Sequence, residues 1–323
     1  MNNTTIPAAC AIALVYIADL IRGREGEFVY NRNGLVAFIV SALEREYAEK
    51  GFVTITVHDG TFHCDELVMI VLFEYVTGLR CKVIRSRTEI TSCINGDVGR
   101  GQFDHHGPLD DKIRCAASRI FCALYQTPEY HDRFPEEWWR KVAEIVDLVS
   151  HQDNTGEMNG LFPYVSTLSR HSSVTKTDNF GTALEMMRAD LTAKLDLLLE
   201  EVKQFAEIEP LINEQANEDV MVFDRNTTAV DVKQIIWERN LPVVFIVSPN
   251  GKDWSVFPAP EQTAEYKRNS SKKLFDPKFR GLDDAALAAV CGLDDAVFCH
   301  AKGFAAKFHS KESAVKFAKM NLN

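Results

Sequence analysis

The chain has 323 residues, of which 46% are hydrophobic and 25% are charged, and its formal net charge at pH 7 is −10. This composition is ordinary for a globular protein, and the length allows two domains with cores of their own. The negative charge does not favour long-range attraction to nucleic acid or to an acidic membrane, so a polyanionic partner needs a local basic surface or bound cations. The eight cysteines form no C-x-x-C pair. That excludes a zinc ribbon and a thioredoxin motif and favours an intracellular, cytoplasmic location.

The first 50 residues are predicted to form a helical extension. Within it, residues 6–21 read IPAACAIALVYIADLI, which is short for a membrane span and is interrupted by Asp19. Neither Lys nor Arg precedes this run, so a signal or transit peptide is not favoured. We therefore expect a buried helix here and no membrane partner.

From residue 51 to residue 178, short apolar runs alternate with helical patterns. Alternation of this kind favours a parallel sheet with helices on both faces, so the predicted fold class is α/β. Strands are expected at 53–57, 82–86 and, more weakly, 94–98, and helices at 65–78, 113–125 and 136–149.

A long helix over about 180–208 is expected to connect this domain to a second one, which covers 179–323. Strands and helices in the order found there indicate a smaller α+β domain packed against the first. The strands are predicted at 220–224, 241–248, 253–258 and 296–301, and the helices near 230–239, 283–290 and 310–320.

The stretch HDGTFHCDE, residues 58–66, directly follows the first predicted strand. It contains four side chains that can bind a metal ion or move a proton, namely His58, His63, Asp65 and Glu66. They leave the carboxyl end of a strand, where open α/β sheets usually carry their sites. The alternative is a polar loop in which Thr61 or Asp65 caps the next helix, and this stretch alone does not decide between the two.

Three further stretches carry the same kinds of side chain. Each has an ordinary explanation by itself, as a turn former, a surface histidine or a helix cap. Together with the first stretch, however, they contain or adjoin five of the nine histidines in the chain. The candidate residues are Asp97 at the end of the third strand, Asp104, His105 and His106 in FDHHG, and Asp147 and Asp153 just past an amphipathic helix.

A mixed set of histidines and aspartates around one central carboxylate suits two adjacent divalent cations. Imidazole nitrogen and carboxylate oxygen are good ligands for Mn²⁺, Mg²⁺ or Zn²⁺. Asp97, at a strand end, is the natural candidate to bridge two ions. Two metals about 3.5–4 Å apart are the standard device for in-line displacement at phosphorus. The predicted cofactors are therefore two divalent ions, Mn²⁺ or Mg²⁺.

The motifs HDGTFHCDE, DVG and FDHH resemble those of the DHH phosphoesterase superfamily. Within it they resemble the Myg-type proteins, whose first motif reads H-N-G-x-F-H-x-D-E. The segments at 279–287, 296–304 and 311–322 are similar to that family's carboxyl-terminal pattern. The resemblance covers about 52–322 and implies a DHH-type catalytic domain over 51–178, followed by a substrate-binding domain.

The resemblance implies a set of metal ligands. His58 and His63 would hold one ion and Asp65 the other. Asp97 would bridge the two ions, and His105 would complete the second site.

The resemblance also implies roles in catalysis and support. His106 would face the substrate phosphate, with Asp104 orienting the pair. Asp147 or Asp153 would supply the last carboxylate, and the spacing does not decide which. A metal-bound histidine normally needs an outer acceptor, so the aspartate left over is a candidate for that support.

The second domain departs from the superfamily pattern, which often ends in a Gly-Gly-His segment that grips the phosphate. Residues 303–309 read GFAAKFH, with Ala306 and Lys307 in place of two glycines. Close backbone approach to a phosphate is therefore in doubt, although Lys307 can supply charge. The segment 267–280 has six basic residues against one acid. The predicted substrate-binding residues are Lys272, Lys273, His300 and Lys307, and a solvated basic loop is the alternative.

Three functions are compatible with these patterns. The first is a two-metal phosphoesterase, and the family implies a 3′–5′ exonuclease that trims short RNA or DNA ends in the cleft between the domains. The second is a pyrophosphatase or small-nucleotide phosphatase on the same metals. The third is a non-catalytic binding protein that keeps the fold. The intact set of histidines and aspartates favours the first two.

Overall fold

The computed structural model describes residues 47–88, 90, 94–98, 115–225, 227 and 229–322. Residues 1–46 of the expected helical extension lie outside the described residues, and so does the whole FDHHG stretch. Within the described ranges, no helix has the length and apolar character needed to cross a membrane. The chain divides into two compact units between Leu199 and Glu200. The sequence places this boundary earlier, between residues 178 and 179.

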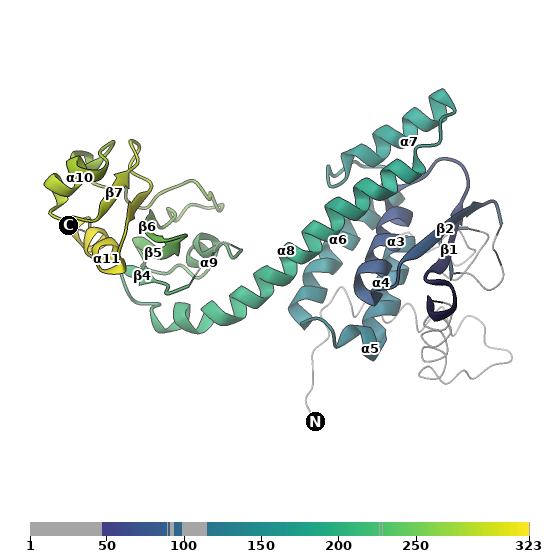
Figure 1. The fold of residues 1–323 in the computed structure, drawn as a ribbon, viewed down its shortest axis with the longest axis horizontal. Helices are drawn as coiled ribbons and strands as arrows, with labels where there is room; N and C mark the ends of the chain where they lie inside the picture. The colour runs from purple at the N-terminus through teal and green to yellow at the C-terminus, as the bar shows by residue number, and fades with distance from the viewer. Residues whose placement is uncertain are drawn as a thin grey trace. The chain divides into compact units, whose positions relative to one another are not determined.

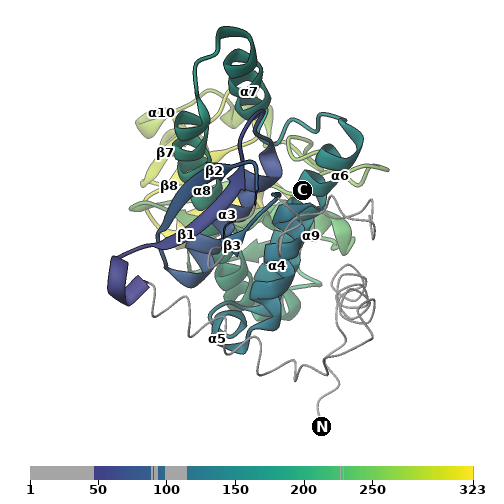
Figure 2. The same ribbon diagram turned by 90° about the vertical axis from the view of Figure 1, so that its right-hand side faces the viewer.

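The first unit contains a parallel sheet with strand order β2–β1–β3, whose strands are all labelled in Figure 2 (Figures 1 and 2). The central strand β1 (Val53–His58) pairs along its whole length with β2 (Cys81–Ser86) and over two residues with β3 (Ile94–Asn95). Residues 53–57 are all buried. The predicted α/β fold with a parallel sheet is confirmed.

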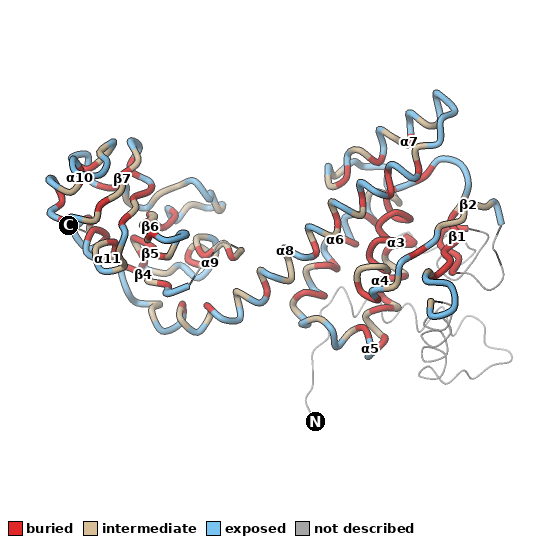
Figure 3. Tube along the Cα trace, in the orientation of Figure 1, coloured by how far each residue is buried: buried red, intermediate tan, exposed pale blue. Residues whose placement is uncertain are grey.

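The helix that links β1 to β2 forms the centre of this unit. This helix, α3 (Cys64–Thr77), is buried along nearly its whole length (Figure 3), because its sequence is apolar on every side. It packs against α4 (Ala116–Gln126) and α6 (Glu136–Thr155), and the short α5 (Pro128–His131) lies between them in sequence. These helices stack on one side of the sheet in both views (Figures 1 and 2).

Two more helices complete the first unit. α7 (Pro163–Thr175) is not predicted from the sequence, because its residues are mostly polar. The expected connector is α8 (Phe180–Glu214), which crosses the boundary between the units. Arg188 of α8 holds this helix against α3 through two hydrogen bonds, of 2.8 and 2.9 Å, to the carboxylate of Glu74. Bidentate contacts of this kind combine charge with fixed geometry.

The second unit is a mixed sheet with strand order β4–β5–β6–β8–β7, in which only β4 and β5 run parallel. Helices accompany this sheet, as predicted for a smaller α+β domain, but β8 is not expected from the sequence. The strands are β4 (Val220–Val222), β5 (Phe245–Asn250), β6 (Asp253–Pro258), β7 (Ala296–Cys299) and β8 (Ala306–Phe308), and the helices are α9 (Val232–Glu238), η1 (Pro277–Phe279), α10 (Asp284–Cys291) and α11 (Lys311–Met320).

Candidate metal centre

Five of the predicted metal ligands converge where β1 and β3 end and α3 begins. They form two groups, one of His58, His63 and Asp97 and one of His63, Asp65 and Asp153. In each group the possible ligand atoms lie within 4.8 Å of one another. The groups share His63, so the two potential cation positions are adjacent.

The local sequence explains how the strand-to-helix loop presents its ligands. β1 ends at His58, and the chain then turns at Gly60, whose φ of 135° is poorly accessible to other residues. α3 begins immediately after His63, which places Asp65 in its first turn. Asp65 also accepts a 3.0 Å hydrogen bond from the backbone of Ala116 at the start of α4. Two helix amino termini therefore stabilise this buried carboxylate.

Asp97 reaches the centre from the strand on the other side of β1. It follows β3 and is buried, with a left-handed backbone φ of 51° that aspartate tolerates better than most residues. The preceding Gly96 lies directly against α3, where an added Cβ would be only 2.2 Å from the Met69 side chain. The Asp97 carboxylate is 3.5 Å from Nδ1 of His58.

Glu66 is a functional residue to which the sequence analysis assigned no role. Its fully buried carboxylate accepts a 2.9 Å hydrogen bond from the backbone of His63 and lies 3.1 Å from Nδ1 of His58. Glu66 thus takes the supporting position that we expected for the unused aspartate. Glu66 lies three residues after His63, the residue that caps α3, and this is the capping-box position. That spacing is a sequence signal for the contact between Glu66 and the His63 backbone.

The contact between His58 and Glu66 changes the acidity of both groups. The hydrogen bond to Glu66 is the largest cause that raises the pKa of His58 to about 9, although burial opposes this rise. Burial raises the pKa of Glu66 to about 7, and the contact with His58 opposes that change. Both shifts favour a proton on this pair, and a cation that binds the His58 ring competes with that proton.

The structure separates the two aspartates that the sequence could not distinguish. Asp153 lies in the last turn of α6, with Oδ1 4.0 Å from Nδ1 of His63 and its side chain only 9% exposed. Asp147 belongs to neither ligand group and is exposed. The prediction that both aspartates lie just past a helix is wrong, because α6 continues to Thr155 and contains both of them. Six residues correspond to a rotation of about 240° around a helix, so the two carboxylates lie on different faces.

The side chains at this centre fit a divalent cation. Asp65, Glu66 and Asp97 are three buried carboxylates beside two histidines. Buried charges are costly unless they are paired or coordinate a metal. Imidazole and carboxylate donors together match the preferences of Mn²⁺, Mg²⁺ and Zn²⁺.

The lysines predicted to bind substrate all make contacts within the second unit. Lys272 donates a 2.8 Å hydrogen bond to the Pro242 carbonyl, and Lys273 donates one of the same length to the Leu322 carbonyl. The ammonium group of Lys307 lies 4.0 Å from the carboxylate of Asp253. Each positive charge therefore has a local structural role.

His300 forms an aromatic pair with Phe304 in the loop between β7 and β8. The half-buried ring of His300 packs against Phe304 with 4.0 Å between the ring centroids and 37° between the ring planes, and its Nδ1 accepts a 3.1 Å hydrogen bond from the backbone of Lys302. Phe304 is 42% exposed. The intervening Gly303 has a φ of 71°, and an added Cβ would lie 2.7 Å from Nε of Arg280. The loop conformation thus requires glycine, and the sequence analysis did not identify Phe304.

Comparison with known proteins gives one matching family model and several relatives. The model is MYG1_exonuc, an uncharacterised protein family (UPF0160), and it matches residues 140–322, more than half of the chain. The MYG1 exonuclease of Bos taurus is 23% identical over 326 residues, covering 82% of this chain and 83% of that protein. The MYG1 exonuclease of Homo sapiens is 23% identical, with coverage of 82% and 84%. A MYG1 protein of Chlamydia pneumoniae is 24% identical, with coverage of 83% and 96%.

Solved structures of the exonuclease RecJ are also similar to this chain. RecJ from Thermus thermophilus in complex with Mn²⁺ is 12% identical with a TM-score of 0.28, and the alignment covers 90% of this chain. The chain spans only about half of that protein, 54%. A manganese-bound exonuclease RecJ is 14% identical with a TM-score of 0.29, and the coverage is 91% of this chain and 94% of that one.

Proposed function

Because the chain belongs to the MYG1_exonuc family, we propose that it is a metal-dependent phosphodiester hydrolase that shortens nucleic acid ends. This membership confirms the Myg-type resemblance of the sequence motifs. The observation that carries the proposal is the pair of adjacent ligand groups that share His63. An isolated ligand group would fit a single structural ion, whereas two adjacent groups fit the paired ions of phosphoryl-transfer enzymes.

The described residues provide the ligands for this reaction. We assign His58, His63 and Asp97 to one cation and Asp65 and Asp153 to the other, and we retain the bridging role for Asp97. Two divalent ions bound there would acidify a water molecule and neutralise the charge that develops at phosphorus. Glu66 fixes the orientation of the His58 ring and the start of α3 through its two contacts.

The FDHHG stretch, outside the described residues, supplies the remaining roles in this proposal. His105 completes the second cation site, while His106 contacts the substrate phosphate and Asp104 orients the pair. Replacing His105 with Ala should therefore lose metal. Replacing His106 with Ala should keep the metal and lower the rate. Equal loss of metal in both variants would contradict these assignments.

The proposed substrate is a short single strand of RNA or DNA, degraded in the 3′–5′ direction. The aromatic pair of His300 and Phe304 supports a strand over a small phosphate, because an exposed ring such as that of Phe304 can stack on a nucleobase. Such stacking tolerates any base sequence, which suits an enzyme that trims ends. Lys302, exposed in the same loop, can neutralise a phosphate.

The decisive experiment combines metal content with a substrate panel. Protein purified without a histidine tag should contain close to two equivalents of Mn or a similar ion by mass spectrometry. It should then release mononucleotides from RNA or DNA that carries a label at the 5′ end, and the ladder of products should shorten from the 3′ end. Less than one equivalent of metal after incubation with Mn²⁺ would contradict the proposal and support a non-catalytic binding protein.

One observation favours a second candidate, a pyrophosphatase or small-nucleotide phosphatase. The ammonium groups of Lys272, Lys273 and Lys307 already contact carbonyl or carboxylate oxygens, so they offer less to a long polyanion. Salt dependence separates the two candidates. Single-strand binding weakens with salt by a slope of about 0.7 per neutralised phosphate. An oligonucleotide affinity that does not change with salt would favour the small substrate.

A further inference from the structure

The loop between β1 and α3 sets the spacing of two proposed metal ligands. It leads from His58 to His63 and contains no regular secondary structure. The rings of these two histidines lie 5.5 Å apart, measured between centroids. Within the loop, Nε2 of His58 lies 2.6 Å from the Thr61 carbonyl, and the Asp59 amide donates a 3.0 Å hydrogen bond to the Ser86 carbonyl. Further contacts come from other parts of the first unit, and they also act on the shape of the loop.

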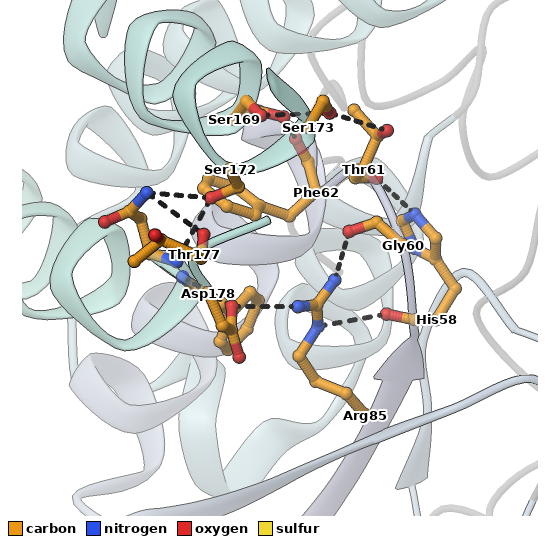
Figure 4. Close-up of polar contacts among 12 residues, drawn as sticks. His58, Gly60, Thr61, Phe62, Arg85, Ser169, Ser172, Ser173, Thr177 and Asp178 are labelled. Atoms are coloured by element: carbon orange, nitrogen blue, oxygen red, sulfur yellow. Dashed lines mark hydrogen bonds and ion pairs between the residues drawn. The ribbon is translucent and has the colours of Figure 1, made fainter. Parts of the chain in front are cut away.

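Arg85 makes two hydrogen bonds to the backbone of this loop (Figure 4). Its Nη2 donates to the Gly60 carbonyl at 2.6 Å, and its Nε donates to the His58 carbonyl at 3.3 Å. The parallel register pairs Arg85 on β2 with Val57 on β1, so one side chain reaches both carbonyls around the strand end. A planar guanidinium suits two such acceptors, whereas lysine presents a compact single charge.

The guanidinium of Arg85 is itself held in place by the connection between α7 and α8. Its Nη1 donates to Oδ1 of Asp178 at 3.1 Å, and the same oxygen accepts a 3.0 Å hydrogen bond from the backbone of Phe180. The ring of Phe180 lies 4.8 Å from Cζ of the arginine. The Arg85 side chain is only 19% exposed, whereas the Asp178 side chain that it contacts is 68% exposed.

A third contact reaches the loop from α7. The buried hydroxyl of Ser169 donates a 2.7 Å hydrogen bond to the carbonyl of Phe62, the residue before His63. One turn further along the helix, the Ser173 hydroxyl lies 3.5 Å from that of Thr61 (Figure 4). The loop is thus fixed at both ends, by Arg85 near His58 and by Ser169 near His63.

We propose that Arg85, Asp178 and Ser169 form a loop clamp that sets the geometry of the metal ligands without touching metal or substrate. They are positioning residues, and their role rests on the proposed function because it requires a cation at His58 and His63. Loss of the clamp frees three backbone carbonyls and lets the two histidines separate. Changes to the outer supports of a metal site typically weaken metal binding by about 10- to 100-fold.

A purely structural role for Arg85 makes a different prediction. In that case the arginine only attaches the connection between α7 and α8 to the sheet, and its loss lowers stability while the folded protein binds metal normally. Metal affinity and the absorption spectrum of bound Co²⁺ distinguish the two roles, because both report ligand geometry in the folded protein. Free guanidinium ion can also refill the space left by an Arg85→Ala change.

The experiment compares the wild type with Arg85→Ala, Ser169→Ala and the control Arg87→Ala. Arg87 bonds the Asp59 side chain of the same loop at 3.2 Å but is 87% exposed. We expect Arg85→Ala to raise the Mn²⁺ dissociation constant about 10-fold or more and to change the Co²⁺ spectrum. Millimolar guanidinium should partly restore both properties. The Arg87→Ala variant should stay within about 2-fold of the wild type, because exposed ion pairs contribute little.

The possible outcomes separate the clamp from the proposed function. If the wild type binds neither Mn²⁺ nor Co²⁺, the proposed metal site is wrong, and the proposed clamp is wrong as well because it requires that site. If the wild type binds metal and Arg85→Ala binds it equally well with the same spectrum, the clamp alone is wrong. Should Arg85→Ala fail to fold, Ser169→Ala decides the question, because it removes one hydroxyl. Unchanged Mn²⁺ affinity in that variant would then overturn the proposal.

Discussion

The two units of this protein differ in the surroundings of their charged side chains. In the first unit, Asp65, Glu66 and Asp97 are buried close to one another, with histidines as their neighbours. In the second unit, Lys272 and Lys273 place their ammonium groups on backbone carbonyls. The first arrangement offers carboxylate and imidazole donors to a cation, whereas the two lysines of the second bond to the protein itself. We therefore expect the chemistry to depend on charge in the first unit and on ring contacts in the second.

The strongest test of this contrast is the Asp97→Asn variant. It keeps the size of the side chain but removes a charge that would hold two cations together. We expect activity to fall by several orders of magnitude and bound metal to decrease, with circular dichroism unchanged. Turnover, metal content and the spectrum should be measured on the same preparation. Near-normal turnover would show that the two-metal assignment is wrong.

A comparison of Asp153→Asn with Asp147→Asn tests the ligand groups within one helix. Asp153 lies beside His63, whereas Asp147 is exposed on another face of α6. Asp153→Asn should weaken Mn²⁺ binding by at least about 10-fold, and Asp147→Asn should change it by less than about 2-fold. Isothermal titration with Mn²⁺ provides the measurement. The reverse order of effects would move the last carboxylate to Asp147.

The Phe304→Ala variant tests whether the second unit works through ring contacts. Stacking of one base contributes about 1–3 kcal/mol, so a short oligonucleotide should bind roughly 5- to 160-fold more weakly. Binding can be followed by anisotropy in EDTA, which prevents hydrolysis. Val290→Ala is the matched control, since Val290 is 46% exposed on α10 of the same unit. Equal affinities for both variants would remove the aromatic pair from the substrate site.

The smallest effects are expected for the lysines of the basic segment. Lys272→Ala removes a hydrogen bond to a backbone carbonyl, so it should lower the free energy of unfolding by about 1 kcal/mol. It should leave the salt dependence of oligonucleotide binding unchanged. Lys302→Ala should instead lower the slope of the logarithm of the oligonucleotide binding constant against the logarithm of the salt concentration by about 0.7 in magnitude, because this exposed lysine is available to a phosphate. A flatter slope for Lys272→Ala would restore its predicted role in substrate binding.

Much of the fold was predictable because the segments that form the buried core have clear hydrophobic patterns in the sequence. The run VTITV and the apolar helix after it predicted β1 and α3, whose residues are almost all buried. The missed elements carry weaker patterns. α7 contains many Ser and Thr residues, and β8 has only three residues, Ala306–Phe308, paired on both sides. Tertiary packing rather than local pattern defines such elements.

The candidate site was predictable in its residue types but not in its distances. Motif spacing selected His58, His63 and Asp97, and the structure brings these three together. It could not separate Asp153 from Asp147, because that choice depends on where α6 ends and which face it buries. Glu66 was not assigned a role because a buried support has the same sequence signature as a helix cap.

The backbone of Asp97 carries a further consequence. With a φ of 51°, this residue adopts a left-handed backbone conformation that costs stability. Asp97→Gly would relieve this cost, and it should raise the thermal unfolding temperature of the metal-free protein while abolishing its activity. Selection for durability and selection for catalysis therefore act in opposite directions at this position. A search for heat-resistant variants without an activity screen would be expected to discard Asp97 early.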